Sequence, residues 1–193
     1  MNNQNLITAV DLGTSKVSTL IATRSKKKSL EVVGFGISKS NGIKKGCIEN
    51  VSLAVDSIKD SFAQAVEMSK DYSDSVYVSI SGAQMGFENR EDYFSQIGSQ
   101  GVITYEEIIS IPKQVSLKAR NEFREIIHLF PFTYKIDGHG GIVDPVGMHA
   151  QGLDVSTHIV TSNLEQTNLM KQALNGAGLT VEKFVFQPLA DYY

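Results

Sequence analysis

A short stretch near the N-terminus, Asp11-Leu12-Gly13-Thr14-Ser15-Lys16, gathers residue types that can hold a phosphate group. Glycine lets the backbone come close to a ligand, successive N–H groups can form an anion-binding nest, and Lys16 adds a positive charge. Asp11 could hold a magnesium ion through water, because this ion prefers oxygen ligands and keeps much of its hydration. Short motifs of this kind also occur by chance. The stretch therefore predicts either a phosphate-binding turn or a polar hairpin turn without a ligand.

Apolar runs on both sides of this stretch predict the elements that position it. Residues 6–10 and 17–22 are rich in Val, Ile and Thr, and a glycine turn between two such runs is typical of a β-hairpin. Residues 30–38 predict a third strand of the same sheet. Asn50 is a candidate N-cap for a helix with apolar residues at helical spacing, and a strand at 76–81 follows it. The order β-β-β-α-β indicates half of a mixed α/β sheet, in which the last strand runs parallel to one of the first three.

The second half of the chain is less regular. Thr104 and Glu107 form a capping-box pattern that predicts the start of a helix, which Pro112 should kink or break. Asn163 should cap a later helix, with Gln166 in the capping-box position. The other elements predicted here are strands near 85–89 and at 123–130, 132–137, 153–161 and 179–186, and a turn at 138–141.

The composition argues against several classes of protein. A net charge of −3 gives no reason to expect a nucleic-acid partner. The single cysteine, Cys47, cannot build an internal disulfide framework and suits a reducing compartment. No apolar run approaches the roughly 18 residues of a membrane span, and residues 1–5 are polar, so a soluble, cytosolic chain without a signal peptide is expected. His139 and His149 lie in predicted loops and are too far apart in sequence to make a good metal site.

Residues 10–17 resemble the first phosphate loop of the actin-like ATPases, and more narrowly that of the FtsA family of bacterial cell-division proteins. The likeness continues in order over almost the whole chain. The further similar segments are residues 41–46, 76–82, 144–148, 158–161 and 186–190. Each segment is a weak signal alone, and their order makes the resemblance specific.

The resemblance implies an actin-like architecture. Residues 1–83 and 162–193 would form subdomain 1A, a ribonuclease-H-like mixed α/β sheet with helices. Residues 84–161 would form the inserted subdomain 1C, a small α+β domain of the SHS2 type. The change of pattern after residue 82 agrees with an insertion at this point.

The resemblance also implies a nucleotide site. Family members bind ATP with Mg²⁺ between two lobes. The residues that match the phosphate loop are Asp11, Gly13, Thr14, Ser15 and Lys16, with Asp11 the candidate magnesium ligand. Gln187 falls where actin carries the glutamine that orients the attacking water, a role that a neutral amide can fill in phosphoryl transfer. The alternative for Gln187 is a strand-end glutamine that bonds to the backbone.

Partners and location follow from the resemblance as well. Family members associate into filaments, recruit FtsZ and tether it to the inner face of the cell membrane at the division site. Later division proteins would bind through residues 84–161. The lobe that meets FtsZ and a C-terminal amphipathic membrane helix would lie outside these 193 residues. We therefore expect an N-terminal part that alone binds ATP weakly and does not hydrolyse it efficiently.

Two other interpretations make different predictions. A stand-alone interaction module would act through residues 84–161 without nucleotide, and its partner affinity would survive a Lys16→Ala change. A sugar kinase of the same superfamily would need a catalytic Asp and a sugar pocket, and the sequence displays neither.

Overall fold

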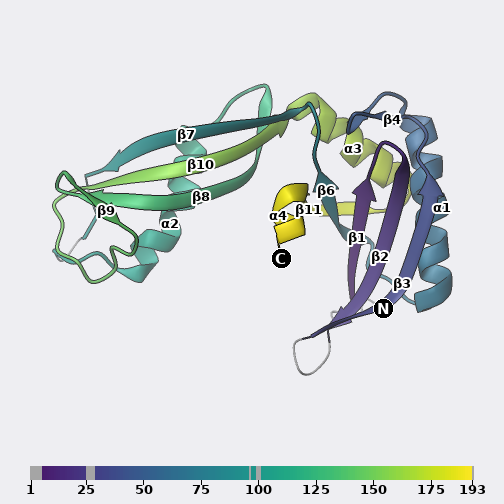
Figure 1. Ribbon diagram of the computed structural model, residues 1–193, viewed down its shortest axis with the longest axis horizontal. Helices are drawn as coiled ribbons and strands as arrows, with labels where there is room; N and C mark the ends of the chain where they lie inside the picture. The colour runs from purple at the N-terminus through teal and green to yellow at the C-terminus, as the bar shows by residue number, and fades with distance from the viewer. Residues whose placement is uncertain (1–5, 25–28, 96, 99–100, 193) are drawn as a thin grey trace. The chain divides into compact units, whose positions relative to one another are not determined.

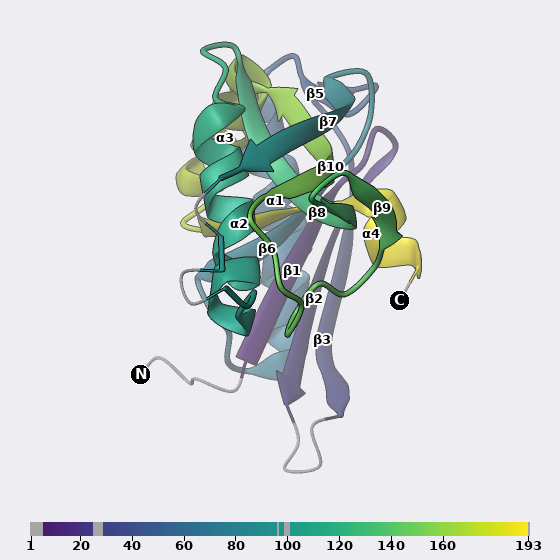
Figure 2. The ribbon, with the colours of Figure 1, turned by 90° about the vertical axis from the view of Figure 1, so that its left-hand side faces the viewer.

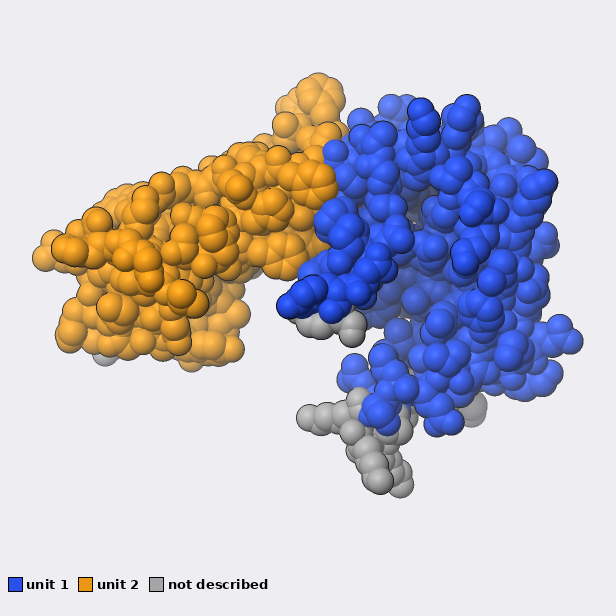
Figure 3. Space-filling view, viewed as in Figure 1, with its two compact units in different colours: residues 1–85, 163–193 blue, residues 86–162 orange. Residues whose placement is uncertain are grey.

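The computed structural model describes residues 6–24, 29–95, 97–98 and 101–192. The chain divides into two compact units, which are coloured separately in Figure 3. Unit 1 comprises residues 1–85 and 163–193, and unit 2 comprises residues 86–162. The chain thus leaves unit 1 once and returns to it once, as expected for an inserted domain.

Unit 1 is built on a five-stranded mixed sheet. Its strands are β1 (Leu6–Leu12), β2 (Lys16–Arg24), β3 (Leu30–Lys39), β6 (Ser75–Ile80) and β11 (Thr180–Phe186). The order across the sheet is β11-β6-β1-β2-β3, with β1, β2 and β3 antiparallel neighbours and with β6 parallel to both β1 and β11. The three antiparallel strands lie side by side in Figures 1 and 2. The predicted meander followed by a parallel crossover strand is confirmed.

Helices α1 (Val51–Ser69) and α3 (Leu164–Gly176) pack against each other, and α1 covers β2 and β3 on one face of this sheet (Figure 1). Asn50 caps α1 as predicted, because its side chain accepts a hydrogen bond from the Leu53 N–H at 3.1 Å. The apolar stripe of α1 buries Ala54, Ile58 and Ala65. A buried hydrogen bond of 2.8 Å between the Thr19 and Ser61 hydroxyls joins the sheet to the helix. Burial of this stripe, rather than helix propensity, holds the helix in place.

Three short elements complete unit 1. Strands β4 (Ile43–Lys44) and β5 (Cys47–Ile48) form a small hairpin, and helix α4 (Gln187–Tyr192) follows directly after β11. Asn163 caps α3 as expected, since its side chain accepts from the Gln166 N–H at 3.1 Å. The Gln166 side chain was predicted to complete a capping box, but its oxygen instead accepts from the Ile48 N–H at 2.9 Å. It therefore anchors the β4–β5 hairpin to α3.

Unit 2 is a four-stranded sheet with one helix. The strands are β7 (Met85–Phe94), β8 (Arg124–Ile136), β9 (His139–Ile142) and β10 (Leu153–Asn163), in the order β7-β10-β8-β9. Helix α2 (Tyr105–Lys118) contributes Ile111 and Val115 to a core shared with Leu153 and Val155 of β10. The predicted capping box, formed by Thr104 and Glu107, is present.

Two predictions for unit 2 are wrong, and a third, the kink or break expected at Pro112, is wrong as far as the break is concerned. Helix α2 continues through Pro112 without a break, because the fully buried side chains Ile111 and Val115 hold both of its halves against the same core. Pro131 lies inside one long strand, β8, instead of ending it. Strand β9 pairs with β8 at Tyr134 and Ile136, and Pro131 lies outside this paired segment. Proline is tolerated in a strand where one side has no neighbouring strand, because its missing N–H is not needed there.

The third correction concerns the predicted turn at residues 138–141. The turn consists of Asp137 and Gly138, both with positive φ, and residues from His139 onward already form β9. Two positive-φ residues match the twist of a tight hairpin, which is why the turn is this short. No helix in the described ranges combines the length and the apolar character that crossing a bilayer requires.

Candidate functional site

The predicted phosphate turn connects β1 to β2 at one edge of the unit 1 sheet. At this edge the carboxyl ends of the three parallel strands β1, β6 and β11 line up, since Asp11 pairs with Ser79 and Ile80 pairs with Phe186. Open α/β sheets bind ligands at the carboxyl ends of their strands. The fold therefore places the predicted turn, the end of β6 and the start of α4 at an edge suited to a ligand.

The turn itself is tight and its polar side chains face solvent. Leu12 pairs with Val17, so the hairpin reverses within the few residues between them. A Cβ on Gly13 would lie 2.7 Å from the main-chain oxygen of Lys16, so only glycine fits there without moving the backbone. Thr14, Ser15 and Lys16 are exposed. A ligand could reach their side chains without a rearrangement of the fold.

Asp11 is half-buried at the end of β1, and its carboxylate is fixed by a neighbouring strand. The Ser79 hydroxyl of β6 donates a hydrogen bond to Asp11 Oδ1. This hydroxyl orients the carboxylate without neutralising its charge. Asp11 therefore remains an oxygen ligand of the kind that a hard cation prefers.

Lys16 lies opposite a second lysine. In the β2–β3 ladder Lys16 pairs directly with Lys39, and both side chains are exposed. Over the described part of the chain, neither ammonium group has a carboxylate within ion-pair distance. Like charges directly opposite each other in a sheet repel. An anion held between or near them would relieve this repulsion.

Gln187 is the first residue of α4 and follows β11 immediately. Its side-chain oxygen accepts a hydrogen bond of 2.8 Å from the Ser81 hydroxyl, just beyond the end of β6. The sequence left two alternatives, a water-orienting amide and a bond to the backbone, and the observed partner is a side chain. The carboxamide is thus fixed at the same sheet edge as the phosphate turn.

Several residues of this edge were not singled out from the sequence. Ser79 and Ser81 belong to a strand that was predicted, and a parallel pairing with β1 would have pointed to them. Gly46, at the tip of the β4–β5 hairpin, donates its N–H to Thr14 Oγ1 at 3.3 Å. Gln84 bonds to Gly46 and to Ser81. No local pattern in the sequence could have indicated the contacts of Gly46 with Thr14 and with Gln84, because these pairs are 32 and 38 positions apart in the chain.

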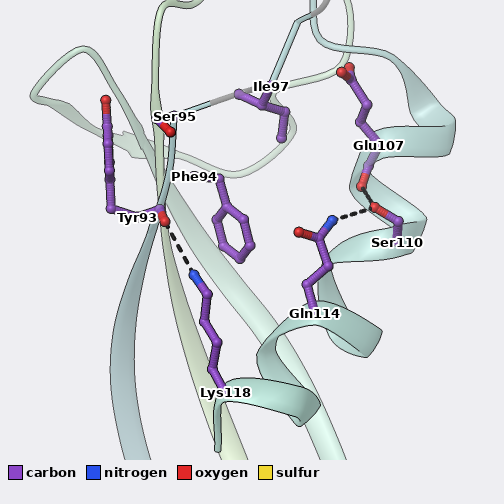
Figure 4. Close-up of a pocket in the computed structure, with 8 residues that line it drawn as sticks. All are labelled: Tyr93, Phe94, Ser95, Ile97, Glu107, Ser110, Gln114 and Lys118. Atoms are coloured by element: carbon purple, nitrogen blue, oxygen red, sulfur yellow. Dashed lines mark hydrogen bonds between the residues drawn. The ribbon is translucent and has the colours of Figure 1, made fainter.

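Unit 2 contains a separate cavity of about 240 Å³ between β7 and α2 (Figure 4). It holds none of the predicted site residues. Lys118 extends along it, donating to the Tyr93 main-chain oxygen at 3.3 Å and placing its ammonium 4.2 Å from the centre of the Phe94 ring. The lining residues are Tyr93, Phe94, Ser95, Ile97, Glu107, Ser110, Gln114 and Lys118. The ammonium group of Lys118 is thus already engaged within the unit.

Comparison with known proteins gives a match to a family model described as "SHS2 domain inserted in FTSA", over residues 82–161. This range covers nearly all of unit 2. Among solved structures, the PilM-PilN type IV pilus biogenesis complex is similar, with a TM-score of 0.63, 12% identity, and coverage of 97% of this chain and 49% of that one. At this identity the likeness concerns the fold alone, and it confirms the expected mixed α/β class.

Curated relatives match along almost the whole chain. "Cell division protein FtsA" of Buchnera aphidicola subsp. Schizaphis graminum is 30% identical over 97% of this chain and 44% of its own length. The protein of the same name from Borreliella burgdorferi is 30% identical over 99% of this chain and 46% of its own length. The protein of the same name from Escherichia coli K12 is 26% identical over 99% of this chain and 45% of its own length. The chain thus spans about half the length of the curated relatives it matches.

Proposed function

We propose that this chain, which is an FtsA-like cell division protein with an actin-like fold, holds the phosphates of ATP and a magnesium ion at the Gly13–Lys16 turn. The observation that carries the proposal is the meeting of separate chain segments at one sheet edge. Asp11, the phosphate turn, Ser79 and Gln187 come together where the parallel strands end.

The residues at this edge fit a phosphate. The tight geometry of the turn requires glycine at position 13, and the absence of a side chain there lets a ligand approach the backbone closely. The exposed hydroxyls of Thr14 and Ser15 and the ammonium of Lys16 are hydrogen-bond donors, and charge-assisted bonds to phosphate are the strong ones. The exposed lysines Lys16 and Lys39, which face each other in the β2–β3 ladder, add an attraction for anions.

The donor set also fits magnesium. This ion is usually held by one or two carboxylates together with water and substrate phosphates, and the edge offers the carboxylate of Asp11. When bound, the ion would neutralise part of the phosphate charge. Gln187 would hold a water molecule through its carboxamide, which the Ser81 hydroxyl keeps in place.

We further propose that unit 1 corresponds to subdomain 1A, residues 1–83 and 162–193, and unit 2 to subdomain 1C, residues 84–161. The division of the structure after residues 85 and 162 supports these limits. In this proposal the whole protein forms filaments, recruits FtsZ through a second lobe and binds later division proteins through unit 2. It would act at the cytoplasmic face of the membrane at the septum, where a C-terminal helix would anchor it.

The test is a nuclear magnetic resonance titration of the 193-residue chain with ATP and Mg²⁺. Backbone amides of Asp11 and residues 13–16 should shift, and so should the side-chain amide of Gln187. Lys16→Ala should weaken binding about 10- to 100-fold, because hydrogen bonds to charged groups contribute about 1.5–3 kcal/mol. Lys59→Ala, an exposed lysine on α1, is the matched control and should leave the affinity unchanged.

The titration has clear contrary outcomes. Equal affinities for the wild type and Lys16→Ala would show that the turn does not hold the phosphates. Shifts confined to unit 2, or no shifts at all, would refute the nucleotide site and favour an interaction module that acts through residues 84–161.

A further inference from the structure

We propose that Gln84 is a positioning residue of this site, whose carboxamide fixes the distance between the phosphate turn and Gln187. The inference rests on the proposed function and goes beyond it, since Gln84 touches neither the expected phosphates nor the expected water. It acts through the two segments that do.

The Gln84 side chain is buried, with 6% of its surface exposed, and lies directly before the start of β7. A carboxamide nitrogen carries two N–H donors, and both are used here. The nitrogen donates to the main-chain oxygen of Gly46 at 2.9 Å and to that of Ser81. The carboxamide oxygen accepts from the Cys47 thiol at 3.3 Å. One side chain thus ties the β4–β5 hairpin to the end of β6.

From these two anchor points the contacts continue to the two halves of the site. Gly46 donates its N–H to Thr14 Oγ1 at 3.3 Å, which connects the hairpin to the phosphate turn. Ser81 donates its hydroxyl to Gln187 Oε1 at 2.8 Å. Gln84 therefore stands at the branch point of one hydrogen-bonded network that reaches both the turn and the water-orienting candidate.

The two anchored segments are in direct backbone contact. A Cβ on Gly46 would lie 2.4 Å from the Ser81 oxygen, and a Cβ on Gly82 would lie 2.4 Å from the Lys45 oxygen. Both glycines also have positive φ. Such close packing leaves the carbonyl groups of Gly46 and Ser81 facing Gln84, and no larger side chain could be placed between the segments. The carboxamide is what holds them together from the buried side.

Loss of the carboxamide should therefore change geometry at the site more than it changes the fold. The Gly46 and Ser81 oxygens would lose these donors, and the hairpin tip could move relative to β6. Small displacements of positioning groups weaken ligand binding and slow reactions even when no contact to the ligand is removed. The effect should reach Thr14 through Gly46 and Gln187 through Ser81.

The test compares Gln84→Met with Gln166→Met in the 193-residue chain. Gln166 is the matched control, because its side-chain oxygen holds the same hairpin by accepting a hydrogen bond from Ile48 N–H but, among the described residues, it makes no hydrogen bond to the turn. In the nucleotide-free chain, Gln84→Met should shift the Thr14 amide and the Gln187 side-chain amide, and Gln166→Met should not. ATP affinity should fall about three- to tenfold in Gln84→Met alone, because a small displacement of the turn weakens its contacts with the phosphates without removing them.

A second variant keeps the test valid if Gln84→Met does not fold. Gln84→Asn keeps a carboxamide on a side chain one methylene shorter, which cannot reach both carbonyl oxygens, so it should cause shifts and a loss of affinity at the same places. Equal effects of Gln84→Met and Gln166→Met on affinity would overturn the inference and leave Gln84 a structural residue. The same holds if Thr14 and Gln187 signals stay in place in both Gln84 variants.

The failure of the proposed function can be told apart from the failure of this inference. If ATP causes no shifts at the turn of the wild type, the nucleotide site is refuted and the positioning role falls with it. If the wild type binds ATP at the turn and Lys16→Ala weakens it, but the Gln84 variants bind normally, only the role of Gln84 is refuted.

Discussion

Replacing Gly13 by alanine should distort the phosphate turn while unit 1 remains folded. The new Cβ would lie 2.7 Å from the Lys16 main-chain oxygen, about 0.7 Å inside the 3.4 Å at which ordinary van der Waals contact begins. The obstructing atom belongs to the backbone, so the turn itself must open. Overpacking of this kind costs about 1–3 kcal/mol. Because the turn is exposed at the sheet edge, the strain should be absorbed locally.

The assay combines urea unfolding with the ATP titration. Gly13→Ala should lower the free energy of unfolding by about 1–3 kcal/mol. It should also lower ATP affinity at least about tenfold, since the backbone N–H groups of the turn would no longer converge on the proposed phosphate. Gly140→Ala is the control, because a Cβ there would meet only the flexible Lys135 side chain at 3.4 Å. Wild-type affinity in Gly13→Ala would refute the idea that the tight turn is what holds the phosphates.

Four further changes test the fold and the site. Ile58→Ala should lower the free energy of unfolding in urea by about 2–5 kcal/mol, because the side chain is fully buried, whereas Leu53→Ala on the exposed side of α1 should cost less than about 1 kcal/mol. Thr104→Ala should cost about 1 kcal/mol and speed amide exchange in the first turn of α2, since it removes the cap; unchanged exchange would contradict the capping role. Asp11→Asn should weaken ATP binding with Mg²⁺ present and have little effect in EDTA, and equal losses in both conditions would argue against a magnesium ligand. Burial raises the pKa of the Cys47 thiol above its ordinary value. The protonated thiol therefore stabilises the fold at neutral pH, and this contribution is lost as pH rises through the raised pKa. Iodoacetamide should react more slowly at pH 7 with Cys47 of the folded chain than with Cys47 of the chain in urea.

Local signals were sufficient for most of unit 1. The glycine turn between two apolar runs predicted β1 and β2, and Asn50 with its apolar stripe predicted α1, because each of these patterns acts over a few neighbouring residues. In unit 2 the strand β7 runs to Phe94, well past the predicted end. Its periodicity is hidden by Asp92, which is buried and bonded to the Arg90 guanidinium at 2.8 and 2.9 Å. A paired buried carboxylate looks like a surface residue in the sequence.

The prolines show where local rules give way to the core. Pro112 has the low helix propensity that predicts a kink or a break, but buried side chains on both sides of it keep α2 a single continuous helix. Such an outcome depends on which face of the helix meets the sheet, and this is not readable from the residues near the proline.

The candidate site divides in the same way. Its contiguous part, residues 11–16, was predicted from residue types alone. Ser79 and Ser81 needed the parallel pairing of β6 with β1, and Gln84 needed the close approach of the β4–β5 hairpin. These contacts join segments more than thirty residues apart, and only the folded topology brings such segments together.

The strand order of the unit 1 sheet has a consequence for biosynthesis. β6 ends at Ile80, but its neighbour β11 begins at Thr180, after the whole of unit 2. A ribosome adds about 5–20 residues per second, so one side of β6 stays open for roughly 5–20 s after its own synthesis. An unpaired strand edge is a template for wrong partners, and parallel pairing across such a separation forms slowly. The nascent chain should therefore depend on a chaperone, or on rapid folding of unit 2, to bring Asn163 back to Gln84 and deliver the last strand.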